Sequence, residues 1–475
     1  MAKIWLDVTT TLAWRRPAVG VVRLETEYAE YVLSLNSTNL HFCRYQIDKG
    51  FQEVSSLEVR SSLTRISGLE NSGAIKSSLD ELPLFSDSIA LDAKYLIKLR
   101  LNNLILNTIR KLPIKFQNPI IVIAVKLKKV FTNSVNFLKK YIYKLININT
   151  NKEQELVLKS ESNANSINCQ FASDDIYISM GADWNHSDVS HVYHAKKKYG
   201  LKVILFCYDI IPIKLPHLTL EWVAKKFPTY YYNIAWTADE ILCISECSKK
   251  DLIKFLEKIG TPIPSLKVFR LGCQLPKYSE LNNSLVINNL KNQKYILYVS
   301  TIERRKNHEV LYRAYTRLID AGEKNLPIMI FVGMEGWGVG ELLTDIRLDP
   351  RTQKNILILN KVTDSELMTL YKYAFFTVYP SLYEGWGLPV AESLAAGKFC
   401  LASNAASIPE IAGDLIEYLD PWNLPMWVER LKWYFNNPLA IACYEAEIKI
   451  KYKSTTWNEA STFIHSRILA AIAKS

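Results

Sequence analysis

The sequence predicts an α/β protein that contains two doubly wound parallel sheets. Along most of the chain, short runs of β-branched and aromatic residues alternate with stretches of helical period, a pattern that is typical of βαβ units. A polar, Asn-rich stretch at 274–294 separates one series of such units from a second series. The 475 residues are enough for two or three domains with complete hydrophobic cores.

The domain boundaries follow from this pattern. We expect an N-terminal domain over residues 1–273, an interdomain linker over 274–294 and a second domain over 295–440. The remaining residues, 441–475, are expected to be helical. In the first domain the expected strands span residues 3–9, 176–179, 203–209, 240–245 and 266–272. In the second domain they span residues 295–300, 328–333, 356–360, 375–379 and 399–403.

Helices are expected between these strands. They include residues 24–35, 189–199, 249–259 and 364–373. Thr363 and Ser407 each open a pattern in which a hydroxyl residue is followed three positions later by Glu, and this pattern predicts a capping box. Residues 50–92 are Ser-rich and weakly periodic, so they are expected to form loops with short helices.

Composition excludes several classes of protein. About half of the residues are hydrophobic and a fifth are charged, as in soluble globular proteins. The eight cysteines are scattered and complete no zinc pattern, which favours reduced thiols in a cytoplasmic protein. We expect no signal peptide, since charged residues interrupt the early apolar run, and no apolar run approaches the ~20 residues of a membrane span.

The net charge of +11 is concentrated in one segment. Residues 93–152 hold thirteen Lys or Arg and no Asp or Glu, so the rest of the chain carries about −2 (11 − 13). Cationic residues interleaved with Ile and Leu are typical of helices that lie in an anionic lipid interface. We therefore expect a peripheral contact with the cytoplasmic face of a membrane. A solvated hairpin packed on the N-terminal domain is the alternative, while nucleic-acid binding would call for more stacking aromatics.

One stretch combines a strand, a glycine-containing loop and a helix. Residues 375–379 form the expected strand, and a short helix is expected from Pro389 to Gly397. Loops at the carboxyl ends of parallel strands are where open α/β sheets bind ligands. The candidate binding residues of this stretch are Glu384, Gly385, Trp386, Gly387, Leu388 and Glu392.

This stretch carries a family resemblance. Glu384 and Glu392, with seven residues between them in EGWGLPVAE, resemble the E-x7-E signature of retaining GT-B glycosyltransferases of the GT4 family, also called group 1. The resemblance implies two Rossmann-like domains that face each other across a cleft, with the basic segment as a helical insertion in the first. It also implies that the final helix returns to the first domain. In this fold, Glu392 would face ribose hydroxyls, and Glu384 would face the sugar of a nucleotide-sugar donor.

A cationic run lies after the first strand of the second domain. Cations at a helix start oppose the helix dipole, and an anionic ligand would resolve that conflict. The run resembles the phosphate-binding loop of the family, which implies that Arg305 and Lys306 grip the donor diphosphate. Two positions depart from the family pattern, because Ser300 replaces a glycine and Thr301 replaces an arginine. Arg304 is the alternative to Arg305.

The resemblance places further residues at the donor site. Gly20 matches a glycine loop that faces the diphosphate, although an ordinary tight turn also explains it. Gly333, Lys361 and Val362 lie where relatives hold the base. Asp209 follows Tyr208, which stands where many relatives carry a histidine. Asp209 therefore remains a candidate catalytic residue that faces acceptor or sugar, or a cap for the following turn.

We expect neither a metal nor a cofactor. No Asp-x-Asp occurs in the chain, and Arg305 with Lys306 can neutralise the diphosphate in place of a metal. A metal site built from His186, Asp188, His191 and His194 is the alternative, although their spacing matches no familiar ligand pattern.

The sequence thus predicts a retaining, metal-independent hexosyltransferase. The expected donor is a nucleotide sugar, with GDP-mannose as the first choice ahead of UDP- and dTDP-sugars, and the expected acceptor is a glycan or a lipid-linked sugar of a bacterial-type surface polysaccharide or glycolipid. A sugar-nucleotide epimerase on the same fold is the main alternative. A retaining glycosidase also uses two carboxylates but needs no phosphate clamp. A non-catalytic scaffold protein would be expected to have lost residues of the site, whereas both glutamates and both cations are present in this sequence.

Overall fold

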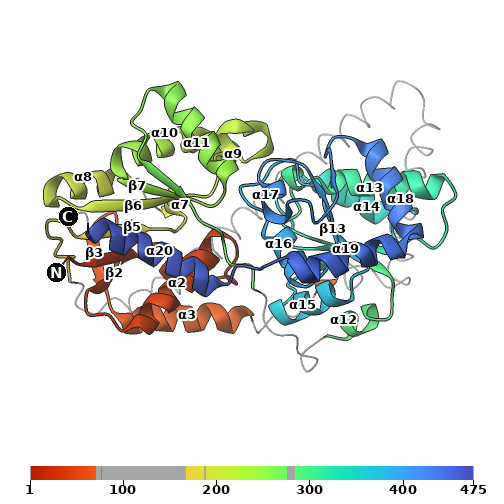
Figure 1. The fold of residues 1–475 in the computed structure, drawn as a ribbon, viewed down its shortest axis with the longest axis horizontal. Coiled ribbons are helices and arrows are strands. Elements are labelled where there is room, and N and C mark those ends of the chain that lie inside the picture. Colours follow the sequence, from red (N-terminus) through yellow and green to blue (C-terminus); the bar gives the residue numbers. More distant parts are fainter. Residues whose placement is uncertain (1, 71–75, 78–166, 187–188, 275–283, 474–475) are drawn as a thin grey trace, which may run out of the picture. The chain divides into compact units, whose positions relative to one another are not determined.

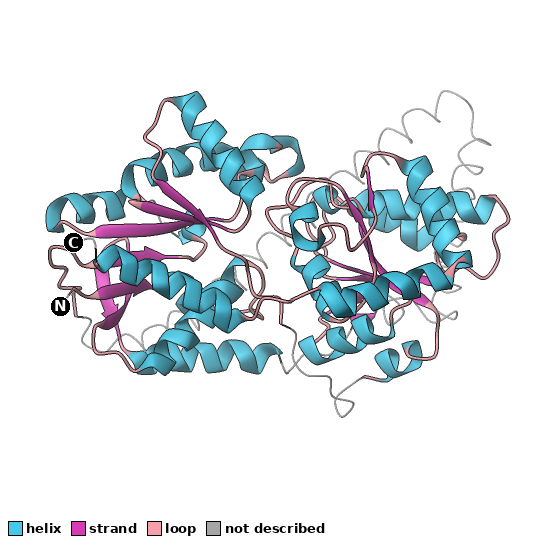
Figure 2. Cartoon of the chain, in the orientation of Figure 1, coloured by secondary structure: helices cyan, strands magenta, loops and turns pink. Residues whose placement is uncertain are grey.

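The protein is described by a computed structural model that covers residues 2–70, 76–77, 167–186, 189–274 and 284–473. The basic segment 93–152, with its expected membrane contact, lies outside the described residues. Two seven-stranded sheets organise the described chain (Figures 1 and 2). Among these residues, no helix combines the length and the apolar character needed to span a bilayer.

The first sheet has the strand order β3-β2-β1-β5-β6-β7-β8. All neighbouring strands are parallel except β2 and β3, which form an antiparallel hairpin. The strands are β1 (Ile4–Asp7), β2 (Leu40–Gln46), β3 (Gly50–Val54), β5 (Ile176–Ser179), β6 (Lys202–Cys207), β7 (Glu240–Cys243) and β8 (Ser265–Val268).

Helices cover both faces of the first sheet because alternate residues of its strands point to opposite faces. On β5, Ile176 and Ile178 belong to a core shared with α2, α3 and α20, whereas Tyr177 belongs to a core shared with α8, α10 and α11 (Figure 1). These helices are α2 (Val21–Leu35), α3 (Ser56–Glu70), α8 (Ser190–Tyr199), α10 (Glu221–Thr237), α11 (Glu246–Ile259) and α20 (Trp457–Ile472). Shorter helices are α1 (Thr9–Ala13), α7 (Asp183–His186), α9 (Ile211–Lys214) and η1 (Pro216–Leu218).

The second sheet has the order β14-β13-β12-β9-β10-β11-β4. Its strands are parallel apart from β4, a two-residue edge strand that pairs antiparallel with β11. The strands are β4 (Lys76–Ser77), β9 (Tyr295–Val299), β10 (Ile328–Val332), β11 (Ile356–Asn360), β12 (Phe376–Tyr379), β13 (Cys400–Ser403) and β14 (Tyr418–Leu419).

Helices also cover both faces of the second sheet. α12 and α15 pack on one face, and α13, α14 and α18 pack on the other. The helices are α12 (Leu285–Leu290), η2 (Arg304–Lys306), α13 (His308–Asp320), α14 (Gly340–Leu348), α15 (Asp364–Tyr373), α16 (Leu388–Ala395), α17 (Ile408–Ala412), α18 (Leu424–Asn436) and α19 (Pro438–Lys451). The capping box predicted at Thr363 is present at the start of α15.

The stretch 274–294, expected to be a linker, contains helix α12, whose Ile287 and Leu290 are buried against the second sheet. A different sequence expectation is wrong. Residues 50–92, expected to be loops with short helices, include strand β3 and the fifteen-residue helix α3. In both stretches, few apolar residues contact the core of the domain. The hydrophobic period of the sequence is therefore weak, although the elements themselves are packed.

Buried acids gather where β1 and β5 lie side by side, the point at which the strand order of the first sheet reverses. Asp7, at the end of β1, accepts a hydrogen bond from the Tyr177 hydroxyl at 2.6 Å. Glu25, on α2, accepts bonds from the backbone N–H and hydroxyl of Thr11 at 2.7 and 2.6 Å. Asp183 accepts from the Ser179 hydroxyl at 2.8 Å. The Tyr177–Asp7 bond joins β5 to β1, and the Ala182 N–H, which donates to the Thr10 hydroxyl at 2.9 Å, joins the chain after β5 to the chain after β1.

Glu25 is the most deeply buried member of this acid cluster, with 1% of its surface exposed. Its Oε2 has no hydrogen-bond partner within the described part of the chain. A Cβ on Gly181 would lie 2.2 Å from that oxygen, so only glycine fits there. Burial, opposed by the bonds from Thr11 and reinforced by Asp7 and Asp183, raises the pKa of Glu25 to about 8. The side chain is therefore protonated at neutral pH.

Replacing Glu25 by Gln tests this protonation state. A carboxyl group whose pKa is higher in the folded than in the unfolded protein stabilises the fold at low pH and loses that effect as pH rises through the folded value. In the wild type, Glu25 should lower the unfolding free energy by about 1.4 kcal/mol per pH unit between its unfolded pKa and pH 8. Urea unfolding at pH 6, 7 and 8 should show a shallower decline for Glu25→Gln.

The control is Glu341→Gln, a change at an exposed position on α14, which should leave the pH dependence as in the wild type. An equal decline in wild type and Glu25→Gln would show that Glu25 is ionised in the fold.

Candidate functional site

The predicted strand–loop–helix element is present in the second domain. β12 ends at Tyr379, and α16 begins at Leu388 with a proline in its first turn, where the missing N–H leaves no bond unmade. Gly387 has a φ of +124°, a backbone conformation that favours glycine. The EGWG loop, residues 384–387, thus lies at the carboxyl end of a central parallel strand, where ligands of such sheets bind.

A second loop follows the neighbouring strand β9 and holds the predicted cations. Hydrogen bonds join this loop to the chain before Glu384. The Leu382 N–H donates to the Arg305 carbonyl at 2.8 Å, and the Ser381 hydroxyl donates to the same carbonyl at 3.2 Å. The Asn307 side chain donates to the Pro380 carbonyl at 3.2 Å. The two loops therefore form one framework whose side chains are fixed relative to each other.

Glu384 lies between the two cations. Its Oε1 accepts from Lys306 Nζ at 2.6 Å, and its Oε2 pairs with Arg305 Nη1 at 2.8 Å. Ser381 and Tyr379 donate their hydroxyls to Oε1 at 2.6 and 3.1 Å. All three charged side chains are at least 85% buried. Burial alone would raise the pKa of Glu384, but the charges of Arg305 and Lys306 outweigh it and lower that pKa to about 2.

Glu303 completes the clamp, the cluster formed by Glu303, Arg305, Lys306 and Glu384. Its buried carboxylate pairs with Arg305 Nη2 at 2.7 Å. The clamp thus holds two cations and two carboxylates, so its formal charge is zero. A ligand that carries a diphosphate can use the two cations fully only if a carboxylate gives up its contacts, and Glu384 is the one that contacts both.

Glu392 lies apart from the clamp, in the second turn of α16. Its Oε2 accepts from the Tyr371 hydroxyl at 3.1 Å. Burial raises the pKa of Glu392 to about 7, although the charge of Arg23 on α2 and the Tyr371 bond oppose that rise. The side chain can therefore accept hydrogen bonds from a ligand as a carboxylate or donate one as an acid near neutral pH.

The loop residues beside the two glutamates are well packed. Trp386 is buried, and its indole N–H has no acceptor within the described residues. Leu388 packs against the core of the domain. Ser407 does not cap α17, so the capping box predicted there is wrong. Its hydroxyl instead lies 2.9 Å from the carbonyls of both Glu384 and Trp386 and fixes the loop from outside.

The other predicted residues of the second domain follow its strands at the same carboxyl edge. Thr301 is exposed, and the Ser300 hydroxyl lies 3.3 Å from His308 Nε2. Gly333 follows β10 with a φ of +156°, and a Cβ there would lie 2.0 Å from the Ser300 carbonyl oxygen. Lys361 follows β11 and is exposed, whereas the neighbouring residue Val362 packs on the core.

The first domain contributes one predicted residue to this loop. A Cβ on Gly385 would lie 3.0 Å from the Cβ of Asp209, so the two backbones approach closely. The Asp209 carboxylate also accepts from the Ile211 N–H at 2.9 Å, the capping role considered from the sequence. Tyr208 directs its hydroxyl to the Met180 carbonyl. Gly20 has a φ of +53°, precedes α2 and is exposed, as a turn residue would be.

Sequence reasoning missed the residues that hold the clamp together. Glu303, Tyr379 and Ser381 all contact Arg305, Lys306 or Glu384. Tyr379 and Ser381 lie within five residues of Glu384 in the same motif, which is the only sequence signal that could have identified them.

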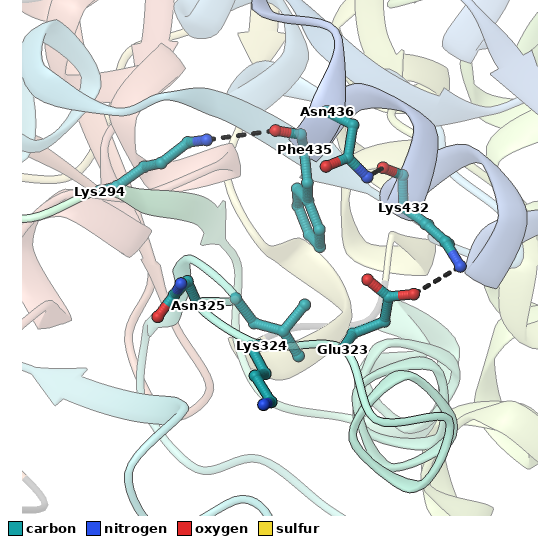
Figure 3. A pocket seen from close by; sticks show the side chains of 8 residues that line it. Lys294, Glu323, Lys324, Asn325, Lys432, Phe435 and Asn436 are labelled. Atoms are coloured by element: carbon teal, nitrogen blue, oxygen red, sulfur yellow. Dashed lines mark hydrogen bonds and ion pairs between the residues drawn. The ribbon is translucent and has the colours of Figure 1, made fainter.

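The histidine set considered as an alternative metal site includes Asp188, which lies outside the described residues. Within the described ranges, no three His, Cys, Asp or Glu side chains form an arrangement that could hold a metal. His191 stacks on Tyr45 with ring centroids 3.5 Å apart. A cavity of about 270 Å³ lies between Lys294, Lys324 and Lys432 at the amino edge of the second sheet, where Lys432 pairs with Glu323 (Figure 3). That edge is opposite the clamp.

Comparison with known families identifies the second domain. Residues 282–450 match the model of the family described as "Glycosyl transferases group 1". This part of the chain is similar to the group 1 glycosyltransferases, and the match covers 169 of the 475 residues (450 − 282 + 1). The matched residues hold the whole clamp and both glutamates. With the first sheet, they give the chain a two-domain α/β architecture.

Two mannosyltransferases of Escherichia coli are among the curated proteins to which the chain is similar. The serotype-specific mannosyltransferase WbdA is 26% identical over 234 residues, which are 47% of this chain and 28% of WbdA. The O-antigen chain mannosyltransferase B is 33% identical over 186 residues, 39% of this chain and 48% of that protein. The chain thus spans less than half the length of either relative. A solved sucrose-phosphate synthase from Thermosynechococcus elongatus has a TM-score of 0.49, with 15% identity over 63% of this chain and 74% of its own.

The assignment of Arg305 and Lys306 as the phosphate-binding pair predicts that replacing either by Ala reduces activity by at least about a hundredfold, because each cation would face the negative charge that develops on a leaving phosphate. The measurement is turnover with a nucleotide sugar. The loss of either partner also leaves the buried Glu384 with less compensation, which can lower stability by about 3–5 kcal/mol. Circular dichroism must therefore accompany the assay.

The matched control is the neighbouring cation. Arg304 is exposed, so Arg304→Ala should keep nearly normal turnover and stability. If Arg304→Ala abolished turnover while both clamp variants kept it, the assignment of the phosphate-binding pair would be wrong.

Proposed function

We propose that the chain is a glycosyltransferase that transfers a hexose from a nucleotide sugar with retention of anomeric configuration and without a metal. The observation that carries this proposal is the clamp: two buried cations on a carboxylate at the carboxyl edge of the second sheet. Breaking the bond from the anomeric carbon to oxygen leaves the diphosphate more negative and the sugar more positive. Buried cations that are already in place stabilise that separation of charge.

The residues have distinct parts in this reaction. Arg305 and Lys306 bind the diphosphate once Glu384 gives up its contacts with them. Glu384 is then free to accept from hydroxyls of the donor sugar, and Glu392 accepts from the ribose hydroxyls. The leaving phosphate takes the proton of the attacking acceptor hydroxyl on the same face of the sugar, so no separate protein base is needed. Asp209, brought to Gly385 by the fold, lies on the acceptor side.

The remaining nucleotide contacts come from the strand ends beside the clamp. Gly333, Lys361 and Val362 follow β10 and β11 and would face the base. Thr301 would bring its backbone N–H towards the phosphates, whereas the Ser300 N–H donates to the Val332 carbonyl at 2.9 Å, so Ser300 would offer its hydroxyl. In the first domain, Gly20 lies before α2 and would face the diphosphate from there. The open backbone at Gly333, where no Cβ fits, is the observation that best supports a close approach of a ligand.

The donor and acceptor classes rest on the relatives. Both E. coli proteins are named mannosyltransferases, and one name refers to an O-antigen chain. This supports mannose as the transferred sugar, GDP-mannose as the first donor to test, and a glycan or lipid-linked acceptor in surface polysaccharide synthesis. A lipid-linked acceptor would place the enzyme at the cytoplasmic face of a membrane, with segment 93–152 as one contact.

An epimerase that uses the same fold is the alternative, because it would need the same phosphate clamp but no acceptor. Incubation of the protein with donor alone separates the two functions. A transferase leaves the nucleotide sugar largely intact or hydrolyses it slowly, whereas an epimerase converts it to a free sugar or to an isomeric nucleotide sugar.

The proposal predicts transfer from GDP-mannose to a synthetic mannosyl acceptor, with UDP- and dTDP-sugars tested in parallel. Mass spectrometry should show a product one hexose larger, and NMR should show the anomeric configuration of the donor. The reaction should persist in excess EDTA, because Arg305 and Lys306 neutralise the diphosphate. Inversion of configuration, or activity lost to EDTA and restored by Mg²⁺ or Mn²⁺, would contradict the corresponding part of the proposal.

Replacing Glu384 by Gln should separate binding from turnover. Gln keeps hydrogen bonds with Ser381 but removes the charge that neutralises the two cations. The variant should bind the free nucleoside diphosphate as tightly as the wild type or more tightly, while its turnover falls by at least about a hundredfold. Isothermal titration calorimetry with GDP, UDP and dTDP measures the first quantity.

Glu392→Gln is the matched comparison in the same motif. It weakens a ribose contact without changing the clamp, so its nucleotide affinity should fall. Weaker nucleotide binding by Glu384→Gln together with unchanged turnover would show that Glu384 does not compete with the diphosphate.

A further inference from the structure

Helix α10 of the first domain presents an unusual outer face. Its inner face contributes Phe227, Tyr230 and Ile234 to the core. On the outside, Trp222, Tyr232 and Trp236 are 51%, 46% and 47% exposed. Large aromatic side chains that remain half in water on one helix are typical of a surface that binds something.

The exposed residues form a continuous stripe. At about 100° per residue, Trp222, Lys225, Thr229, Tyr232 and Trp236 fall within about 80° of one another around the helix axis. Fourteen positions separate the two tryptophans, which is about 21 Å along a helix that rises about 1.5 Å per residue. Tyr232 and Trp236 have ring centroids 6.5 Å apart. Glu221 borders the stripe and pairs with Lys225 at 2.5 Å.

The surroundings of the stripe are positively charged. Helices α8, α10 and α11 together contain nine Lys, no Arg, and four Asp or Glu, a net charge of +5 (9 − 4). The C-terminal turn of α8 lies beside the end of α10, since Lys196 Nζ donates to the Thr237 carbonyl at 2.9 Å. Lys197 and Lys198 in that turn are exposed. Basic groups therefore flank the aromatic residues.

We propose that the outer face of α10 is a docking surface for a bilayer that contains anionic lipid. The stripe is defined by Trp222, Lys225, Thr229, Tyr232 and Trp236. Trp and Tyr are the side chains that settle at the boundary between lipid headgroups and acyl chains. Lysine extends a long apolar stem to a charged end, which suits the same boundary.

The composition favours lipid over a protein partner. Protein interfaces are enriched in Arg and depleted in Lys, and here all nine basic residues of the three helices are Lys. A lipid surface requires no such preference, because each Lys near an anionic membrane contributes about 1 kcal/mol through its charge alone. The stripe shares no residue with the clamp or with segment 93–152, so its failure would leave the proposed transfer reaction untouched.

The test is co-sedimentation of the full chain with vesicles of phosphatidylcholine alone or mixed with phosphatidylglycerol. The variant Trp222→Ser/Tyr232→Ser/Trp236→Ser should bind mixed vesicles at least about tenfold more weakly than the wild type. The variant should melt at nearly the same temperature, since these side chains are half exposed. Salt should weaken binding of the wild type without abolishing it, because the aromatic contribution is not screened.

The control variant is Trp422→Ser/Leu439→Ser/Ile450→Ser, which removes three apolar side chains that are 70–81% exposed elsewhere in the chain. It should bind like the wild type. As a second measurement, lipids brominated in the acyl chain should quench tryptophan fluorescence in the wild type and less in the α10 variant.

Three results would overturn the proposal. Equal vesicle binding by the wild type and the α10 variant is the first, and it would leave segment 93–152 as the membrane contact to test with Lys→Gln changes at 126, 128, 129, 139, 140 and 144. Equal quenching in the two proteins is the second. The third concerns light scattering without vesicles. If the wild type were a dimer and the α10 variant a monomer, while vesicle binding was unchanged, this face would be a contact between copies of the chain.

Discussion

The site depends on one set of ion pairs, those of Glu384 with Arg305 and Lys306. The partners come from two loops whose residues are 78 positions apart along the chain, and the side chains are almost completely buried. A single buried charge would be strongly unfavourable, so each member is tolerable only because the others are present. The backbone bonds between the two loops, the hydroxyls of Ser381 and Tyr379 and the outer support from Ser407 all keep this arrangement in place.

The balance of charge in the clamp links structure to reaction. Two carboxylates neutralise two cations, which stabilises the cluster without a ligand but leaves no excess of positive charge for a diphosphate. In the proposed reaction, the Glu384 side chain therefore makes two sets of contacts. Without a ligand it pairs with the two cations, and with the donor bound it accepts hydrogen bonds from the sugar. The glycine beside Glu384 serves close packing, because a Cβ on Gly385 would lie 2.5 Å from the Tyr208 carbonyl oxygen.

The first domain solves a different electrostatic problem. Asp7, Glu25 and Asp183 meet at the carboxyl ends of β1 and β5, the usual ligand edge of such a sheet. Here no cation neutralises Glu25, and protonation takes the place of a salt bridge. The same domain carries many of its lysines on helices α8, α10 and α11. These helices cover the face of the sheet opposite to α2, the helix that holds Glu25. In the two proposals, buried charge in the second domain serves ligand binding, and exposed charge on the first domain serves contact with a membrane.

The sequence by itself determined the α/β class, most of the strands and the identity of the glutamates and clamp cations. Strand runs and helical period are local signals, and α15 begins and ends where the pattern predicts because its capping box and its period agree. Motif residues such as Glu384 and Glu392 are equally local. Short elements with little periodic signal, such as α12 and the β2–β3 hairpin, could not be predicted in the same way, since the apolar surface that they cover belongs to distant parts of the chain.

Only the tertiary structure decided how these residues are used. It placed Glu384 on both cations, turned Ser407 from an expected cap into a support for the EGWG loop, and brought Asp209 against Gly385. It also buried Glu25 without a counter-ion and left the aromatic residues of α10 in water. The physical reason is that desolvation and ion pairing depend on which distant segments pack together, and a residue's neighbours along the chain carry little information about that.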